Sequence, residues 1–365
     1  MIAGLAARIG LDRVRRRGAA GAAAAGRVWA AARLAYWLRW KRRRLLLRAI
    51  RKRRQLRAVT DRTAGIAPEA ILAFATLRNE VARLPFFLAH YRALGVAHFL
   101  IVDNGSDDGT LALLCDQPDV SVWSTQASYK LSRFGMDWLT WLHWRHGHGH
   151  WCLTVDADEI LVYPHWETRP LSALTGWLDG EGLQSFGALM LDMYPQGPLD
   201  AAPYQPGSDP VASLPWFDAG NYMIQRHPVY DNLWIQGGVR ARLFFADNPR
   251  RAPTLNKVPL VRWNRRFAYV SSTHQILPRR LNRVYDTLGG ERMSGVLLHS
   301  KFLHMIANKS REELARRQHF ENSDLYTPYH EALMQSPDLW CPHSTKYEGW
   351  QQLEDIGLMS KGNWV

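Results

Sequence analysis

Four short apolar runs, separated by helix-like segments between residues 71 and 155, constrain the fold more than any other feature of the sequence. Continuous apolar runs of this length are typical of strands buried on both faces, as in sheets covered by helices. Strand–helix–strand units of about 30 residues have right-handed crossovers between parallel strands. The pattern predicts an α/β domain with a mainly parallel central sheet flanked by helices, its strands being ILAFAT (71–76), AHFLIVD (97–103), VSVW (120–123) and WCLTV (151–155).

The segments that join these runs are expected to be helical over residues 80–94, 107–115 and 131–145. Farther along, GVLLHSKFLH (295–304) predicts a strand near the end of the domain, and residues 310–320 predict a helix. The Pro- and Gly-rich segment 194–218 predicts a long loop.

Polar and acidic residues follow the predicted strands at the point where each one ends. These clusters are Thr76–Glu80, Asp103–Asp107 and Asp156–Glu159. In open parallel sheets, ligands bind outside the carboxyl ends of the strands, so the three clusters should converge on one binding edge. No GxGxxG follows the first strand and no P-loop lysine motif is present.

Asp156 and Asp158 stand two residues apart at a strand end, so both side chains can lie on one side of the extended backbone. Two carboxylates converging in a cleft need a neutralising cation, and hard oxygen ligands suit Mg²⁺ or Mn²⁺. Such a metal can stabilise a leaving diphosphate. The alternative for an Asp-x-Asp pair is a solvated acidic turn.

The three clusters, read in order, resemble a known family. TLRNE (76–80), IVDNGSDDGT (101–110) and LTVDADEI (153–160) are similar to motifs of family 2 glycosyltransferases with the GT-A fold, in a bacterial subgroup with RNE, DNGSDDGT and DADE motifs. The match covers about residues 70–165. It extends more loosely through GGVRARLF (237–244), NKVPLVRW (256–263), STHQI (272–276) and LLHSKFL (297–303).

The resemblance implies donor-binding positions in the first half of the domain. Thr76, Arg78 and Glu80 would border the nucleotide. Asp103 would contact the base or ribose, with Asn104 shaping the turn. Many relatives carry a second acid at that last position, so the nucleotide preference stays open.

The resemblance also implies a metal site. Asp156 would face the ribose or the metal, and Asp158 would be the main protein ligand. His299 is the best match for the late histidine that often completes the site in this family, with His304 as the fallback. A buried neutral histidine is the alternative reading of His299.

Further candidates have less specific signals. Lys301 is expected near the diphosphate, and Arg240 lies in a Gly-rich segment suited to donor or acceptor. His274 is interpreted either as an acceptor contact or as structural. An inverting transferase needs a general base, for which Asp192 is the first choice and Asp218 the second; each is also a plausible cap or turn acid.

Four histidines, His143, His146, His148 and His150, lie within eight residues and suggest zinc. Gly147 and Gly149 instead predict a surface loop there. The three cysteines form no CxxC, so a disulfide framework is not expected and a reducing, cytoplasmic setting is favoured.

The N-terminal arm carries the charge of the chain. Residues 1–58 hold 18 Lys+Arg and one acid, a net of +17, so the rest sums to 13 − 17 = −4. The composition favours a helix. Arg27, Arg33 and Arg39 interrupt the apolar stretch, so neither a membrane span nor a secretory signal is predicted.

Two interpretations of the arm compete. One is a solvated, partly disordered tail. The other is an interfacial helix with Trp29, Trp37 and Trp40 at headgroup depth and arginines on anionic lipid, which would place the protein on the cytoplasmic face of the inner membrane. No nucleic acid is expected as a partner, because the body is mildly acidic. A chain that starts at Val59 is expected to fold.

Together these features predict a basic arm (1–58), a GT-A-type domain (68–308) and a helical or irregular extension (309–365). The domain would have a nucleotide-binding half (70–165) and an acceptor half (166–308), with 194–218 as an acceptor lid. The expected activity is metal-dependent inverting transfer, with Mn²⁺ or Mg²⁺, from a nucleoside-diphosphate sugar to a carbohydrate or lipid-linked hydroxyl in surface polysaccharide or glycoconjugate synthesis. The alternatives are a non-catalytic membrane-tethered scaffold and a nucleotidyltransferase.

Overall fold

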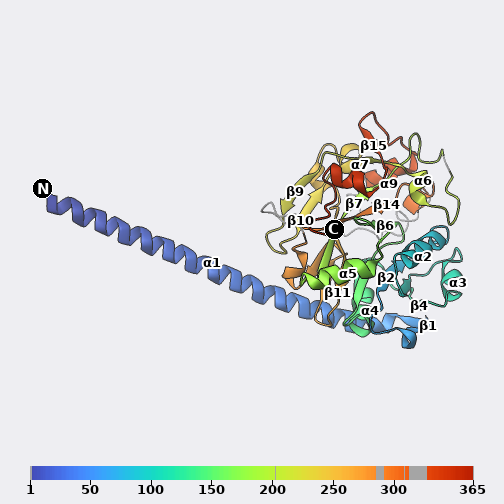
Figure 1. Cartoon of the computed structure of the whole chain (residues 1–365), viewed down its shortest axis with the longest axis horizontal. Helices are drawn as coiled ribbons and strands as arrows, with labels where there is room; N and C mark the ends of the chain where they lie inside the picture. Colours follow the sequence, from blue (N-terminus) through green and yellow to red (C-terminus); the bar gives the residue numbers. More distant parts are fainter. Residues whose placement is uncertain (1, 202, 285–291, 308, 312–326, 365) are drawn as a thin grey trace.

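A nine-stranded sheet lies at the centre of the body of the chain (Figure 1). The structure, a computed structural model, describes residues 2–201, 203–284, 292–307, 309–311 and 327–364, and only the backbone of residues 2–25 and 27. The strand order is β1-β4-β3-β2-β5-β11-β7-β14-β6. The strands are β1 (Arg57–Thr60), β2 (Leu72–Leu77), β3 (His98–Asp103), β4 (Val120–Ser124), β5 (Trp151–Thr154), β6 (Glu159–Val162), β7 (Ser185–Asp192), β11 (Asn256–Arg262) and β14 (Gly295–His299).

Most strands of this sheet run in one direction. The pairs β2–β3, β3–β4, β2–β5 and β7–β14 are parallel. Strand β11 runs antiparallel to both β5 and β7, so β7 and β14 point the same way as β2 to β5. Only β1, β6 and β11 among the described strands of the sheet oppose the other six. The prediction of a mainly parallel sheet with helices is confirmed.

Alternating residues of β2 and β3 face two different helical layers. Ala73, Ala75, Phe99 and Ile101 pack toward α2 (Leu84–Ala93), α3 (Thr110–Cys115) and α5 (Leu171–Gly180). Residues one position away along the same strands pack toward α4 (Met136–His146) on the other face. Burial on both faces explains why the strands are continuously apolar rather than alternating.

Smaller elements cover the second half of the sheet. Short antiparallel pairs join β8 (Trp216–Asp218) with β15 (Ser344–Lys346), β9 (Met223–Arg226) with β10 (Leu233–Gln236), and β12 (Ala268–Ser271) with β13 (Gln275–Leu277). The segment predicted as a loop over 194–218 contains α6 (Pro210–Ser213) and ends in β8. The helix expected over 310–320 lies mostly outside the described residues. The remaining helices are α7 (Gly238–Leu243), α9 (Thr327–Met334) and α10 (Trp350–Asp355).

The segment that contains the four histidines was predicted to be a surface loop, but its first part is helical. Helix α4 continues to His146, which places His143 inside the helix. His143 stacks between Phe74 and Trp263, with ring centroids 3.8 and 4.1 Å away. Its Nδ1 bonds to the Leu139 carbonyl and its Nε2 to the Thr154 hydroxyl. The ring is a neutral core group, and both of its nitrogens are occupied.

Acid should destabilise the fold through such buried histidines. Burial lowers the pKa of His143 to about 3 and that of His90 to about 4, although a backbone hydrogen bond opposes the shift in each case. In the unfolded chain each pKa is about 6.5. Below pH 6.5 the unfolded state therefore binds protons that the folded state excludes, and stability falls as the pH falls.

We expect His143→Gln to isolate this effect. At pH 5 the proton uptake costs the parent about 2 kcal/mol through this one residue. The variant should be less stable than the parent at pH 7.5 but should lose about 2 kcal/mol less between pH 7.5 and 5, measured by urea unfolding. Parallel stability curves for parent and variant would contradict the prediction.

A single long helix, α1 (Ile2–Lys52), projects from the body (Figure 1). Its second half packs on the body: Leu38, Leu45 and Ala49 are buried, and the two leucines join a cluster with Tyr230 and Leu277. No described helix is long and apolar enough to cross a membrane.

The packing of α1 argues against the expectation that a chain starting at Val59 folds normally. Burying a leucine side chain contributes roughly 1.5–3 kcal/mol, so removing Leu38 and Leu45 should lower the free energy of unfolding by about 3–6 kcal/mol. A chain starting at Arg33 keeps these contacts and should retain the stability of the parent. Denaturant unfolding of the two truncations checks this; equal stabilities would show that α1 contributes nothing to the body.

Candidate active site

The turns that follow β2 and β3 interlock at the carboxyl edge of the sheet. The Asn79 amide donates to Ser106 Oγ, and its side-chain Oδ1 accepts from the Asp107 amide. The Glu80 amide donates to Thr110 Oγ1. Gly105 has φ +71°, and an added Cβ there would collide with the side chain of Gln126. The TLRNE and DNGSDDGT motifs therefore build one rigid double turn.

Asp103 and Asn104 have different environments within that turn. Asn104 Nδ2 donates to the carbonyls of Thr125 and Ala127, so this side chain is occupied in shaping the turn. Asp103 Oδ2 accepts from the Gly105 and Ser106 amides. Its Oδ1 is buried without a hydrogen-bond partner.

Unpartnered buried oxygens also occur beside a pocket at the carboxyl ends of β2 and β5. Thr76 and Thr273 line this pocket together with Asp156, and each threonine has a buried Oγ1 without a partner. Buried polar atoms normally find partners, so such groups call for a bound molecule or water. The unpartnered oxygens of Thr76 and Thr273 therefore mark this pocket as a place for water or a small polar group.

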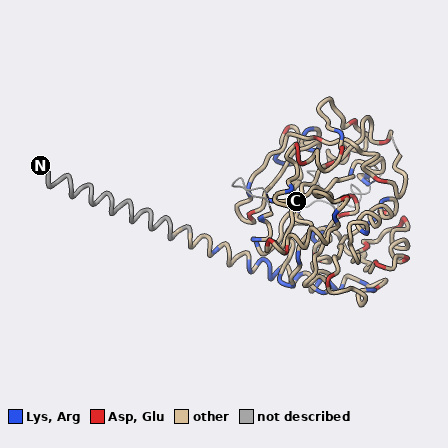
Figure 2. The backbone as a smooth tube through the Cα atoms, viewed as in Figure 1, with Lys and Arg blue, Asp and Glu red and all other residues tan. Residues whose placement is uncertain are grey.

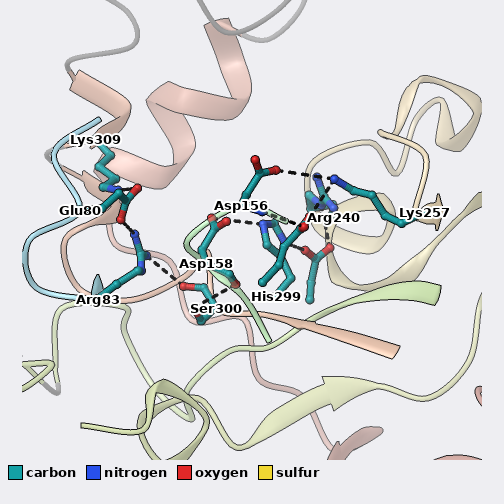
Figure 3. A network of polar contacts seen from close by, with 11 residues as sticks. Glu80, Arg83, Asp156, Asp158, Arg240, Lys257, His299, Ser300 and Lys309 are labelled. Carbon is teal, nitrogen blue, oxygen red and sulfur yellow. Dashed lines mark hydrogen bonds and ion pairs between the residues drawn. The ribbon is translucent and has the colours of Figure 1, made fainter. Parts of the chain in front are cut away.

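The centre of the site is a chain of alternating charges (Figure 3). His299 Nδ1 donates to Asp192 Oδ1 at 2.6 Å, and His299 Nε2 lies 3.3 Å from Asp158 Oδ2. Arg240 Nε donates to Asp192 Oδ2 at 2.7 Å. Each oxygen of Asp192 thus already accepts a hydrogen bond, and the residue is buried.

Strand register produces this chain. His299 ends β14 and pairs with Asp192 of β7 on one side and with Glu159 of β6 on the other. The backbone carbonyl of Asp158 accepts from the Ser300 amide at 2.7 Å, which ties the acidic turn to the end of β14. Segments far apart in sequence are therefore fixed against each other by the sheet itself.

The pKa values follow from these contacts. Burial tends to raise the pKa of Asp158, but His299, with Arg83 and Lys309, holds it well below its ordinary value. Burial likewise opposes ionisation of Asp192, yet Arg240 and His299 lower its pKa to about 2. Burial tends to lower the pKa of His299, and the two carboxylates outweigh this and raise it. The two carboxylates therefore favour the protonated form of His299, and a metal ion bound at Nε2 would replace the proton there.

Asp156 occupies the open side of the site, with 53% of its side chain exposed. Crowding by the surrounding protein and the charge of Glu159 raise its pKa, while Lys257 opposes the rise. Lys257 Nζ lies 2.8 Å from Glu159 and 3.7 Å from Asp156. This buried lysine of β11 neutralises part of the acidic turn.

A second ionic group borders Asp158. Glu80 pairs with Arg83, with a nitrogen–oxygen distance of 3.0 Å, and with Lys309. Arg83 also donates to the Ser300 carbonyl. Arg78 donates to the carbonyls of Asn104 and Gly105, so it supports the double turn.

The spacing of Asp158 and His299 fits one metal ion. Two neighbouring ligands of an octahedral Mg²⁺ at ~2.1 Å lie about 3 Å apart, close to the 3.3 Å between Asp158 Oδ2 and His299 Nε2. A carboxylate and an imidazole also suit Mn²⁺. Among the described residues, no group of three His, Cys, Asp or Glu side chains has the arrangement of a metal centre, so substrate or water oxygens would complete the shell.

The other predicted residues take different places. His304 Nδ1 accepts from the Tyr204 amide, and His274 Nδ1 donates to the Asn256 carbonyl. Lys301 Nζ lies over the ring of Tyr329. Asp218 pairs with Arg242 at 2.9 and 3.0 Å and accepts from a tyrosine hydroxyl.

Sequence reasoning missed Arg83, Lys257 and Lys309. Lys257 had a signal: a lysine inside the apolar strand NKVPLVRW must find an acidic partner when it is buried. Arg83 and Lys309 lie in helical contexts where a cation is ordinary, so nothing in the sequence singled them out.

No protein-family model matches the sequence, and no curated protein matches it. Among solved structures, a Bacillus anthracis protein described as a glucose-1-phosphate thymidylyltransferase, in complex with a sucrose, is similar. The likeness covers 72% of this chain and 84% of that chain, with 8% sequence identity and a TM-score of 0.29. At this level it carries no argument about function.

Proposed function

We propose that the chain is a metal-dependent inverting glycosyltransferase, of the GT-A type, acting on a nucleoside-diphosphate sugar. The observation that carries this proposal is the pair Asp158–His299, spaced for one ion. The pair lies at the same sheet edge as the unpartnered oxygens of Asp103 and Thr76. The motif resemblance of residues 70–165 supports the same reading.

In this proposal, two groups of residues at this edge of the sheet bind different parts of the donor. Asp103 Oδ1 accepts from ribose hydroxyls or a base N–H, which suits an acceptor-only carboxylate. Asp158 and His299 would hold Mn²⁺ or Mg²⁺, which would supply charge neutralisation for the departing diphosphate. Asp156, on the open side, would face the ribose or the metal.

The acceptor is a carbohydrate or lipid-linked hydroxyl. Its oxygen forms a bond to the anomeric carbon as the bond to the diphosphate oxygen breaks, and the acceptor proton passes to a base. Asp192 is poorly suited as that base, because its pKa is about 2 and it is held between Arg240 and His299. We assign Asp192 to orienting His299. Asp218 remains the proposed base; Arg242 and Tyr194 engage both of its oxygens, so it would take the proton after exchanging an Arg242 contact for the acceptor hydroxyl.

Product analysis tests the proposal against its alternatives. The full-length chain is incubated with UDP-, GDP- and TDP-sugars, Mn²⁺ and simple sugar acceptors; we expect release of nucleoside diphosphate that depends on the metal. Release of pyrophosphate from nucleoside triphosphate and sugar 1-phosphate would assign the chain to the nucleotidyltransferases instead. Thermal stabilisation by a nucleotide without either product would favour a binding protein.

A further inference from the structure

Helix α1 carries two opposite faces along residues 28–52. Leu34, Leu38, Leu45 and Ala49 recur at spacings of 4, 7 and 4 and contact the body. Trp29, Tyr36, Trp40 and Leu47 recur at spacings of 7, 4 and 7. At about 100° per residue the second set lies half a turn from the first. The aromatic set therefore points away from the body.

This outward face is apolar and exposed. Trp29 is 77% exposed, Tyr36 63%, Trp40 45% and Leu47 54%. At ~1.5 Å per residue, the stripe from Trp29 to Leu47 is about 27 Å long. Tyr36 and Trp40 contact each other edge to face. Exposed aromatic stripes of this kind on a soluble surface mark an interaction site.

Positive charge shares the same face. Four exposed arginines project from the same side of α1 as the aromatic residues: Arg33, Arg43, Arg44 and Arg51. Residues 26–58 contain no acid. Figure 2 shows the resulting concentration of Lys and Arg where α1 meets the body.

Beside α1 the body adds further arginines, although it also neutralises one arginine of the helix. The pKa of Arg42 is lowered, first by burial and then by the like charges of Arg39, Arg266, Arg280 and Arg43. Arg48 has an acidic partner, Asp137, at 2.5 Å. The positive charge that surrounds Arg42 favours an anionic ligand.

We propose that the outward face of α1 binds the surface of an anionic lipid bilayer, with the helix lying in the interface. A bilayer surface offers both an apolar boundary for Trp29, Tyr36, Trp40 and Leu47 and anionic headgroups for the arginines between them. Nucleic acid offers phosphates without the apolar phase, and a second copy of this basic helix repels the first. This inference does not depend on the proposed enzyme activity.

Vesicle flotation tests the proposal with the full-length chain. We expect binding to phosphatidylcholine vesicles containing 30% phosphatidylglycerol, about tenfold or more above binding to pure phosphatidylcholine, with weakening as salt screens the charges. Arg43→Glu/Arg44→Glu should reduce the partition coefficient at least tenfold. The matched control, Arg250→Glu/Arg251→Glu, makes the same charge change on exposed residues of the body and should bind as the parent does.

A second pair of variants tests the apolar half of the stripe. Trp29→Ala/Trp40→Ala should lower the partition coefficient and remove the binding that persists at high salt, whereas Leu131→Ala/Ile224→Ala, at exposed positions on the body, should not. Equal binding to neutral and anionic vesicles, or equal loss in the arm and control variants, would overturn the proposal. Binding to duplex DNA without binding to vesicles, or lipid-independent self-association that the Trp variant abolishes, would also overturn it.

Discussion

Replacing Asp158 with Asn is expected to lower kcat for metal-dependent sugar transfer at least a thousandfold, equivalent to about 4 kcal/mol in the barrier. The carboxylate lies 3.3 Å from His299 and keeps its negative charge, because neighbouring cations hold its pKa well below the ordinary value. An amide has nearly the same shape but no charge for the ion. The loss should therefore come from the metal and not from packing.

The measurement is initial-rate kinetics with Mn²⁺ varied over several decades, together with thermal unfolding of each variant. Asp116→Asn is the matched control, since this acid is exposed and follows α3 away from the site. We expect the control to retain the activity of the parent. If the Asp158 variant kept activity within threefold of the parent at any Mn²⁺ concentration, Asp158 would have no role in the reaction.

Local patterns predicted the first half of the fold well. The apolar runs at 71–76 and 97–103 correspond to β2 and β3. They could be recognised because a strand that is buried on both faces is apolar along its whole length. The polar turns after β2 and β3 were found from their place at the strand ends and from their motifs. Asn79 and Gly105 in these turns adopt positive φ, which few residue types tolerate. Such constraints act within a few residues and can be read along the chain.

The ionic arrangement of the site could not be read in this way. The pairing of His299 with Asp192 depends on β14 entering the sheet beside β7, a contact across 107 residues. The sequence placed Asp192 at the end of an apolar run but could not show that Arg240 and His299 occupy both of its oxygens. Its expected role as a base rested on position alone.

The reassignment of Asp192 leads to a separable prediction. A carboxylate that accepts from the distal nitrogen of a metal-binding histidine fixes the tautomer and orientation of the ring, and its loss typically costs 10–100-fold in metal affinity. We therefore expect Asp192→Asn to raise the Mn²⁺ concentration needed for half-maximal activity by about 10–100-fold. Saturating Mn²⁺ should restore most of kcat.

A general base would behave differently. If Asp192 took the acceptor proton, its replacement would lower kcat at every Mn²⁺ concentration, and no amount of metal would restore it. Asp218→Asn is the matched comparison, because we expect it to lower kcat while leaving the metal titration unchanged. An Asp192 variant that shows this second pattern would return the base role to Asp192.

Stability must be measured alongside, because Asp192 also neutralises a buried cation. Its side chain is 2% exposed and that of Arg240 is 5% exposed, and breaking a buried ion pair costs about 3–5 kcal/mol. The double variant Asp192→Asn/Arg240→Gln removes this uncompensated charge and should recover part of the lost stability. If Asp192 orients His299, the weakened Mn²⁺ titration persists in the double variant, since the imidazole still lacks its carboxylate. A titration that returns to that of the parent would show that the stranded charge of Arg240, rather than the orientation of His299, had weakened the metal site.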